Sequence, residues 1–223
     1  MKIVGLFGSK GGTGKSTLSH LLALGCAMHG KPGLVVHTDA REPERHHGRP
    51  YHYLDGRDPR RLYAALERAK AASEGIAVLD GGGNRAGIAG ILAQACDLVL
   101  IPCGIGGQDA TMALADLAAL PGSWIVINRW PMLPLHPRRP KAAAYIAQLP
   151  VDRILCRLGE SAAADRLTES DSEEHPWAAL PTRVTHAARQ FYSAVSDRLR
   201  RAELQHPEDH RRPPLGERQN DQS

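Results

Sequence analysis

The residues with the clearest chemical potential lie in one short run near the start of the chain, Lys10-Gly11-Gly12-Thr13-Gly14-Lys15-Ser16-Thr17. Its glycines allow the backbone to turn with N–H groups pointing inward. These donors, together with the dipole of a following helix, stabilise phosphate oxygens. At this spacing Lys15 would reach the β- and γ-phosphates of a nucleotide, and Ser16 would offer its hydroxyl to Mg²⁺. We therefore expect residues 11–17 to bind ATP or ADP, although Ser9 replaces the first glycine of the usual pattern.

Three further polar residues follow apolar runs that read as strands: Asp39, Asp80 and Asn128. In open α/β sheets, ligands bind beyond the carboxyl ends of the parallel strands, so these side chains are expected near the glycine-rich run. A simpler interpretation also exists for two of them, because Asp39 can cap a turn or helix and Asn128 can occupy a turn.

Apolar strand-like runs alternate with helical patterns, which indicates an α/β fold with a mostly parallel twisted sheet and helices on both faces. The predicted strands cover residues 3–7, 34–38, 76–79, 98–101, 124–127 and 153–156. Predicted helices follow the glycine-rich run to about residue 30 and then cover 86–95, 109–120, 141–149 and 185–204. One more helix begins at Pro59 with Asp58 as its N-cap, and Asp109 is the expected N-cap of the helix over 109–120.

The remaining segments are predicted to be irregular. Residues 41–57 read as a loop, because they show no period and are rich in Arg, His, Gly and Pro. We expect a single domain over residues 1–204 and a disordered polar tail over 205–223.

The composition is that of a globular protein, with 42% hydrophobic and 23% charged residues among 223. The four cysteines form no CxxC pair, and we expect reduced, mostly buried thiols of a cytosolic protein. The first apolar run is too short for a signal peptide, and none approaches the length of a membrane span. A net charge of +4 and a pI near 9.0 are compatible with nucleic-acid contact but do not require it.

The glycine-rich run, with its additional lysine at Lys10, resembles the deviant Walker A motif of ParA/MinD-type ATPases. The resemblance covers about residues 1–200, and it implies a P-loop NTPase architecture and slow, partner-stimulated hydrolysis of ATP. In that family the extra lysine reaches across an ATP-bound homodimer to the partner's nucleotide. A second ammonium there adds to the cationic field around the transferring phosphoryl group. Lys10, Lys15 and Asp39 are accordingly the expected catalytic residues.

The same resemblance assigns roles at the strand ends. Asp80 resembles the Walker B aspartate, which holds Mg²⁺ directly or through a water, and the glycines at 81–83 resemble a switch loop that senses the γ-phosphate. An asparagine at the place of Asn128 hydrogen-bonds adenine in relatives, and an amide can both donate and accept.

The water-positioning acid has two possible registers. Relatives carry Asp-x-Asp after the second strand, and its second carboxylate positions the attacking water. Here His37 stands in place of the first acid and Asp39 takes the second position. In the other register Asp39 is the first acid and Arg41 replaces the second, which would impair hydrolysis.

The resemblance favours a nucleotide switch in the bacterial cytoplasm, near the nucleoid. ATP would promote a homodimer that binds DNA non-specifically, and a ParB-like or other adaptor would stimulate hydrolysis, so that plasmid, chromosome or other cargo is partitioned. Basic residues that could contact DNA are Arg138, Arg139, Lys141, Arg153, Arg157, Arg183 and Arg189.

Three other functions are weighed against this one. A MinD-like membrane positioner would need a C-terminal amphipathic anchor, but the apolar residues of the last predicted helix are better explained by packing on the domain, so no stable anchor is expected. An iron–sulfur carrier would need a cysteine soon after Asp80, where Gly and Asn follow instead. A low-turnover nucleotide-bound scaffold or conjugation accessory protein is compatible with His37 in place of an acid.

Overall fold

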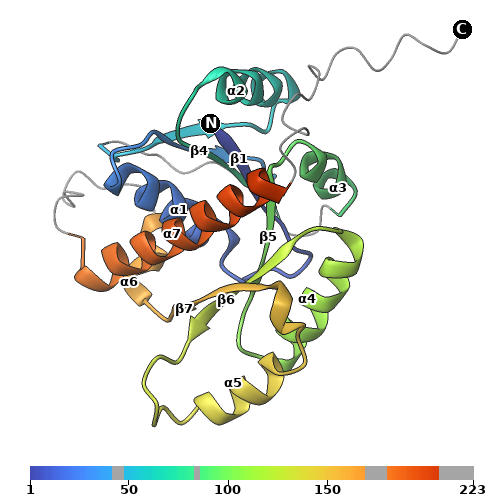
Figure 1. The fold of residues 1–223 in the computed structure, drawn as a ribbon, viewed down its shortest axis with the longest axis vertical. Helices are drawn as coiled ribbons and strands as arrows, with labels where there is room; N and C mark the ends of the chain where they lie inside the picture. The colour runs from blue at the N-terminus through green and yellow to red at the C-terminus, as the bar shows by residue number, and fades with distance from the viewer. Residues whose placement is uncertain (42–47, 83–85, 169–179, 206–223) are drawn as a thin grey trace, which may run out of the picture.

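The computed structural model describes residues 1–41, 48–82, 86–168 and 180–205 (Figure 1). Within these residues, seven strands form one sheet in the order β3-β2-β4-β1-β5-β6-β7, and every neighbouring pair is parallel. The strands are β1 (Lys2–Leu6), β2 (Gly33–His37), β3 (His52–Asp55), β4 (Ile76–Asp80), β5 (Leu98–Cys103), β6 (Trp124–Trp130) and β7 (Ile154–Gly159).

Helices lie between most of the consecutive strands, as is usual where parallel strands are joined. They are α1 (Lys15–Met28), α2 (Pro59–Ala71), α3 (Ala86–Gln94), α4 (Gly107–Ala119), α5 (Arg139–Ile146), α6 (Ala162–Asp165) and α7 (Thr182–Gln205), with short 3₁₀ turns at Val151–Arg153 and Arg166–Thr168. None of the helices in the described ranges is long and apolar enough to cross a membrane.

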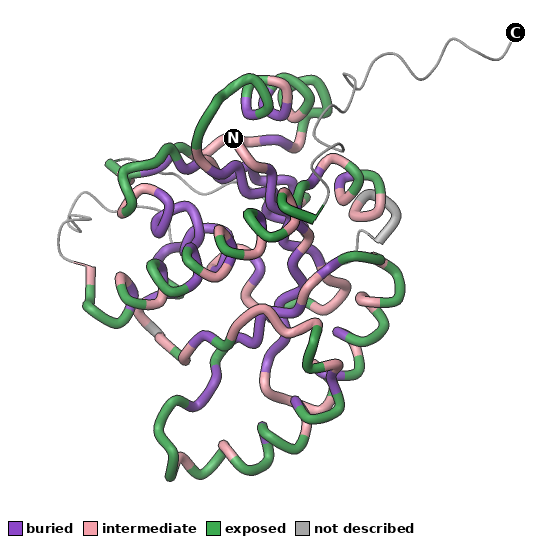
Figure 2. The backbone as a smooth tube through the Cα atoms, viewed as in Figure 1, coloured by how far each residue is buried: buried purple, intermediate pink, exposed green. Residues whose placement is uncertain are grey.

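The central strands β1, β4 and β5 are buried on both faces because they are apolar at nearly every position. In β1, Val4 and Leu6 pack with α1 and α7, whereas Ile3 and the following Phe7 pack with α2 and α3. A third cluster joins β5 and β6 to α4 and α5. Figure 2 shows the resulting buried centre within exposed helical surfaces. The predicted α/β fold with helices on both faces is confirmed.

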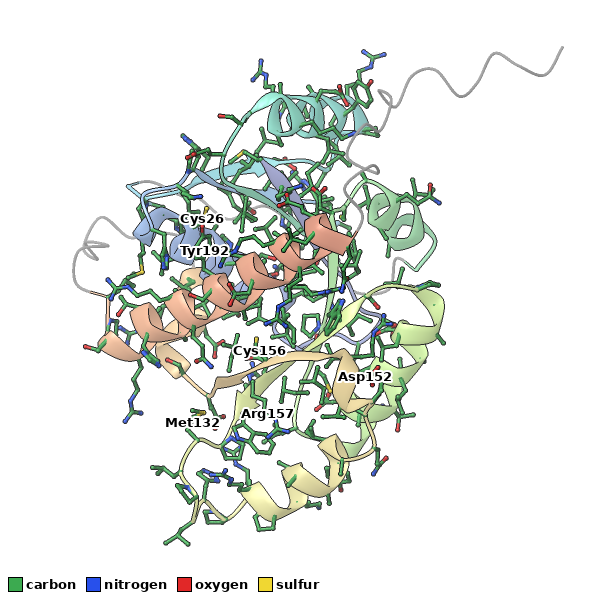
Figure 3. All side chains as sticks on the ribbon, viewed as in Figure 1. Cys26, Met132, Asp152, Cys156, Arg157 and Tyr192 are labelled. Atoms are coloured by element: carbon green, nitrogen blue, oxygen red, sulfur yellow. The ribbon has the colours of Figure 1, made fainter. Side chains whose placement is uncertain are left out.

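Helices α1 and α7 pack directly against each other over the β1 region of the sheet. Gly25 permits this approach, since a Cβ there would lie 2.3 Å from the carbonyl oxygen of Ala188. The rings of His29 and Tyr192 stack with their centroids 4.4 Å apart. Figure 3 labels Cys26 and Tyr192, which lie in the same apolar cluster at this contact.

Several predicted boundaries are wrong. Residues 41–57 are not all loop, because His52–Asp55 form the edge strand β3 beside β2. The residues of β3 are exposed or only half-buried, so the strand carries no buried apolar run that would mark it in the sequence. Residues 162–165 form the unpredicted helix α6, and β6 continues past its predicted end to Trp130.

Pro102 does not close the fourth predicted strand but lies inside β5. Residues two apart in a strand direct their backbone groups to the same neighbour. Leu100 accepts a hydrogen bond from Phe7 on the β1 side, and β1 pairs with β5 no further than Leu100. The donor that proline lacks would therefore point beyond the end of β1, where no strand needs it.

Asp58 is the N-cap of α2 as predicted, accepting hydrogen bonds from the backbone N–H groups of Arg60 and Arg61. Asp109 is not an N-cap. Gly106 holds that position in α4, and Asp109, three residues later, accepts a hydrogen bond from the Gly106 N–H at 2.9 Å. The tail predicted over 205–223 lies outside the described residues after Gln205.

Candidate nucleotide-binding site

The glycine-rich run forms a loop between β1 and the first turn of α1. Gly12 and Gly14 adopt left-handed backbone conformations with φ of 75° and 95°, which glycine adopts without steric strain. Gly14 is the N-cap of α1 and carries no capping side chain, so the first N–H groups of this helix are open to an anion.

The side chain of Lys15 contacts the backbone of Lys10 within this loop. Lys15 is buried, and its Nζ donates a hydrogen bond to the carbonyl oxygen of Lys10 at 2.7 Å. Burial lowers the pKa of Lys15, against the opposing attraction of Asp80, Asp116 and Asp39. The Nζ of Lys10 pairs with Asp109 Oδ1 at 2.5 Å and also lies 3.4 Å from Gln108 Oε1. Sequence reasoning missed Asp109 as the partner of Lys10.

Asp80 ends β4 as a deeply buried carboxylate. Its Oδ1 accepts a hydrogen bond from the Ser19 hydroxyl at 3.4 Å, and its Oδ2 lies 3.9 Å from His37 Nδ1. Thr38, which directly follows β2, donates hydrogen bonds from both its N–H and its hydroxyl to the Asp80 carbonyl oxygen. These hydrogen bonds hold the ends of β2 and β4 together.

The Ser16 hydroxyl and the Asp80 carboxylate face a common cation position. Arg41 Nη2 donates a hydrogen bond to Ser16 Oγ and lies 3.8 Å from Asp80 Oδ2. Oxygen donors of this kind are the ligands that Mg²⁺ prefers. The donor set therefore fits Mg²⁺, with Ser16 and Asp80 as the residues that would hold it.

His37 occupies the last position of β2, directly opposite Asp80 in the register. It is buried, and its Nε2 lies 3.0 Å from the carbonyl oxygen of Arg41. Burial disfavours the charged form of His37, but Asp80 and the Arg41 carbonyl outweigh this and raise its pKa. His37, one of the two positions at which the sequence departs from the expected pair of acids, thus lies next to Asp80.

Asp39 lies at the edge of the same cluster. Its Oδ2 is 3.4 Å from Arg41 Nε, and its Oδ1 accepts a hydrogen bond from the Ala40 N–H. Gly82 allows the close approach of this carboxylate, because a Cβ there would lie 2.6 Å from Asp39 Oδ1. The structure therefore brings Asp39 and Arg41 together with Asp80; of the glycines at 81–83, Gly83 lies outside the described residues.

Asn128 lies within β6 and packs against the loop. Its Nδ2 donates to the Thr13 carbonyl oxygen at 3.0 Å, and its Oδ1 accepts from the Arg129 N–H at 2.9 Å. A Cβ on Gly14 would meet Nδ2 at 2.2 Å, so the loop and this amide fit closely. Asn128 thus positions the loop, and its contact with adenine stays a prediction.

A cleft of about 320 Å³ borders the loop from Lys10 to Thr13. The residues that complete it are Gly104, Ile105, Asp109, Arg129, Arg138 and Glu160. This volume lies at the lower end of the range for small-molecule sites. Sequence reasoning did not place Arg129 or Glu160 here, because they come from β6 and the end of β7.

Another contact missed at the sequence level holds the start of the loop. The Ser9 N–H donates to Asp116 Oδ2 at 3.0 Å and to Oδ1 at 3.2 Å. Asp116 lies on α4, more than a hundred residues away along the chain, and no local motif marks it.

The four cysteines fit their expected role as reduced thiols. Cys26, Cys96 and Cys103 are buried and Cys156 is half-buried. Burial raises the pKa of Cys26 to about 11 and that of Cys103 and Cys156 to about 12. Across the described ranges, no three side chains of His, Cys, Asp or Glu lie together in a way that could hold a metal ion.

No protein-family model matches this sequence, and comparison with curated proteins gives no significant match. Solved structures share the fold. A variant of McdA from Cyanothece in complex with ATP has a TM-score of 0.57 at 18% identity, covering 88% of this chain and 96% of its own. MinD from Pyrococcus horikoshii with Mg-ADP has a TM-score of 0.57 at 14% identity, with coverages of 90% and 98%.

A ParA-family ATPase from Chlorobium tepidum has a TM-score of 0.59 at 12% identity, covering 86% of this chain and 98% of its own. At these identities the likeness establishes the fold. This chain therefore has the P-loop architecture of MinD, McdA and ParA-family ATPases, as the sequence resemblance implied.

Proposed function

We propose that this protein is a ParA-like ATPase that binds Mg²⁺ and ATP at the loop between β1 and α1 and acts as a nucleotide-dependent dimerisation switch. The convergence of Ser16 and Asp80 beside the loop is the observation that carries the proposal. Solved proteins of the same fold hold ATP or Mg-ADP, which supports nucleotide as the ligand.

The residues divide the chemistry among them. Backbone N–H groups of the loop and Lys15 neutralise the phosphates, and bound Mg²⁺ would supply further charge stabilisation from its place on Ser16 and Asp80. Asp39 orients the attacking water, and Lys10 approaches the nucleotide of a partner subunit. Turnover is slow and is stimulated by an adaptor, as the resemblance to ParA/MinD-type ATPases implies.

The cellular role follows from the switch. In the ATP state the homodimer binds DNA non-specifically in the bacterial cytoplasm and partitions or positions cargo with a ParB-like or other adaptor protein. Four of the proposed contact residues come from the segment between β6 and β7: Arg138, Arg139, Lys141 and Arg153. Arg157 lies in β7, and Arg183 and Arg189 lie on α7. DNA binding is supported here by charge alone.

A second candidate is a nucleotide-bound scaffold with little turnover. The position of Arg41 favours it, because this residue stands two places after Asp39 and lies among the oxygens of the site. A membrane-positioning role has less support, since Phe191 and Val195 of α7 are fully buried against the domain.

The deciding experiment measures binding of a fluorescent ATP analogue with saturating Mg²⁺ to the wild type, Lys15→Ala and Lys31→Ala. We expect Lys15→Ala to weaken binding at least about tenfold, because a charge-assisted phosphate contact is lost. Lys31→Ala is the matched control, since Lys31 is an exposed residue outside the loop. Equal affinity of the wild type and Lys15→Ala would refute nucleotide binding at this loop. Turnover by Asp39→Ala then separates the enzyme from the scaffold, because equal rates would contradict a catalytic role for Asp39.

A further inference from the structure

The Arg41 guanidinium lies among three oxygen-bearing side chains of the phosphate site. Its Nη2 donates to Ser16 Oγ and is 3.8 Å from Asp80 Oδ2, and its Nε is 3.4 Å from Asp39 Oδ2. Two of these side chains are the ones that fit Mg²⁺. A single positive group therefore lies where the metal ion of the proposed reaction would bind.

The backbone of Arg41 is anchored so that its side chain reaches this position. The buried His37 ring contacts the Arg41 carbonyl oxygen at 3.0 Å, and Arg57 Nη1 donates to the same oxygen at 3.5 Å. Arg41 thereby turns back over the end of β2 toward Ser16, which lies 25 residues earlier in the sequence. A guanidinium stays charged at every physiological pH, and its planar fork can contact several oxygens at once.

Mg²⁺ and the Arg41 guanidinium compete for the same oxygens of Ser16 and Asp80. Mg²⁺ held by Ser16 and Asp80 would use oxygens that Arg41 Nη2 already contacts or approaches. Asp80 is buried, so repulsion between the two cations is only weakly screened there. The Arg41 side chain is 48% exposed, whereas that of Asp80 is 2% exposed.

We propose that Arg41 is a resident cation of the phosphate site, which neutralises Asp80 before Mg²⁺ arrives and competes with the metal for Ser16 and Asp80. The inference rests on the proposed nucleotide binding and deepens it. Arg41 is a positioning residue in this scheme, because it acts on the metal site and not on the reacting atoms. It makes Mg²⁺ binding weaker than the oxygen donors alone would allow.

The test titrates Mn²⁺, a paramagnetic substitute for Mg²⁺, into the full chain with saturating ADP, and it follows free Mn²⁺ by electron paramagnetic resonance. We expect Arg41→Ala to lower the dissociation constant of Mn²⁺ about three- to tenfold, because the competing charge is gone. Arg41→Lys keeps the charge but loses the fork and should fall between the two. Arg60→Ala, an exposed arginine on α2, should match the wild type.

Each outcome decides the matter. An unchanged or higher Mn²⁺ dissociation constant in Arg41→Ala, with ADP bound normally, overturns the inference and leaves the proposed function in place. Failure of wild-type protein to bind ADP overturns both. Thermal unfolding by circular dichroism confirms that the variants fold. If Arg41→Ala does not fold, Arg41→Gln removes the same charge with less loss of volume and supplies the measurement.

Discussion

Lys10 and Asp109 form an ion pair within one chain. The pair is mostly shielded, with side-chain exposures of 28% and 18%, and Asp109 also accepts the Gly106 N–H at the start of α4. In the proposed dimer Lys10 must instead approach the nucleotide of the partner subunit. Forming the proposed dimer therefore requires the Lys10–Asp109 ion pair to break, and the free energy of that ion pair weakens dimerisation.

Asp109→Asn should strengthen ATP-dependent dimerisation. An ion pair of this exposure contributes roughly 0.2–1 kcal/mol, and a homodimer separates two of them, so we expect the dimer dissociation constant to fall about two- to thirtyfold. Sedimentation velocity with a non-hydrolysable ATP analogue measures the effect. Asp197→Asn breaks an exposed ion pair with Arg200 on α7 and is the matched control. A dimer that is no tighter in Asp109→Asn than in this control would count against Lys10 acting across the dimer.

Among the elements, α1 joins the phosphate loop to the core. Its first turn presents Lys15 to the loop, and its remaining length packs on the sheet and on α7. The close approach of the two helices depends on Gly25, because the nearest neighbour of a Cβ there is backbone and cannot rotate away.

Gly25→Ala should lower the free energy of unfolding by about 1–3 kcal/mol, as overpacking does in a closely packed core. In a chain of this size that corresponds to a melting temperature lower by about 2–4 °C per kcal/mol. Gly90→Ala on α3 is the matched control, because a Cβ there meets nothing within 4 Å and alanine favours a helix. Urea unfolding of both variants checks the prediction, and equal stability of the two would mean that α1 and α7 separate freely.

At the scale of the whole molecule, the basic residues near β6 and β7 differ in how far they are neutralised. Arg138 pairs with Glu160 at 2.5 Å, whereas Lys141 lies 6.0 Å from the Tyr145 ring centroid. Arg157, labelled in Figure 3, lies over Trp130, with 4.9 Å from its guanidinium carbon to the ring centroid. A cation paired with a carboxylate contributes less to the attraction of DNA than one without such a partner.

Lys141→Ala should therefore weaken non-specific DNA binding more than Arg138→Ala. Each phosphate contact contributes roughly 0.9 to the slope of log affinity against log salt, and Lys141→Ala should reduce this slope by about that amount. Fluorescence anisotropy of a labelled duplex with ATP, repeated at several salt concentrations, gives the slopes. A slope for Lys141→Ala equal to that of the wild type would show that Lys141 is not a contact, and the absence of wild-type binding at low salt would remove the DNA proposal.

Local sequence was sufficient to predict the glycine-rich loop between β1 and α1 and most of the sheet. Gly12 and Gly14 adopt left-handed backbone conformations, and a glycine is a local signal for such a conformation. The continuous apolar runs of β1 and β4 likewise predict buried parallel strands. Asp58 and Pro59 likewise fix the start of α2, because an N-cap acts within three residues of itself.

The tertiary structure alone decided the partners of these residues. The contacts of Arg41 with Ser16 and of Ser9 with Asp116 join positions 25 and 107 residues apart, and they depend on strand order and register, which no local pattern encodes. β3 exists because the edge of β2 offers it backbone hydrogen bonds and not because its own residues are apolar. The sequence by itself therefore determined a glycine-rich loop on a parallel sheet, whereas packing between distant segments placed Arg41 beside Ser16 and Asp80, and Asp109 against Lys10.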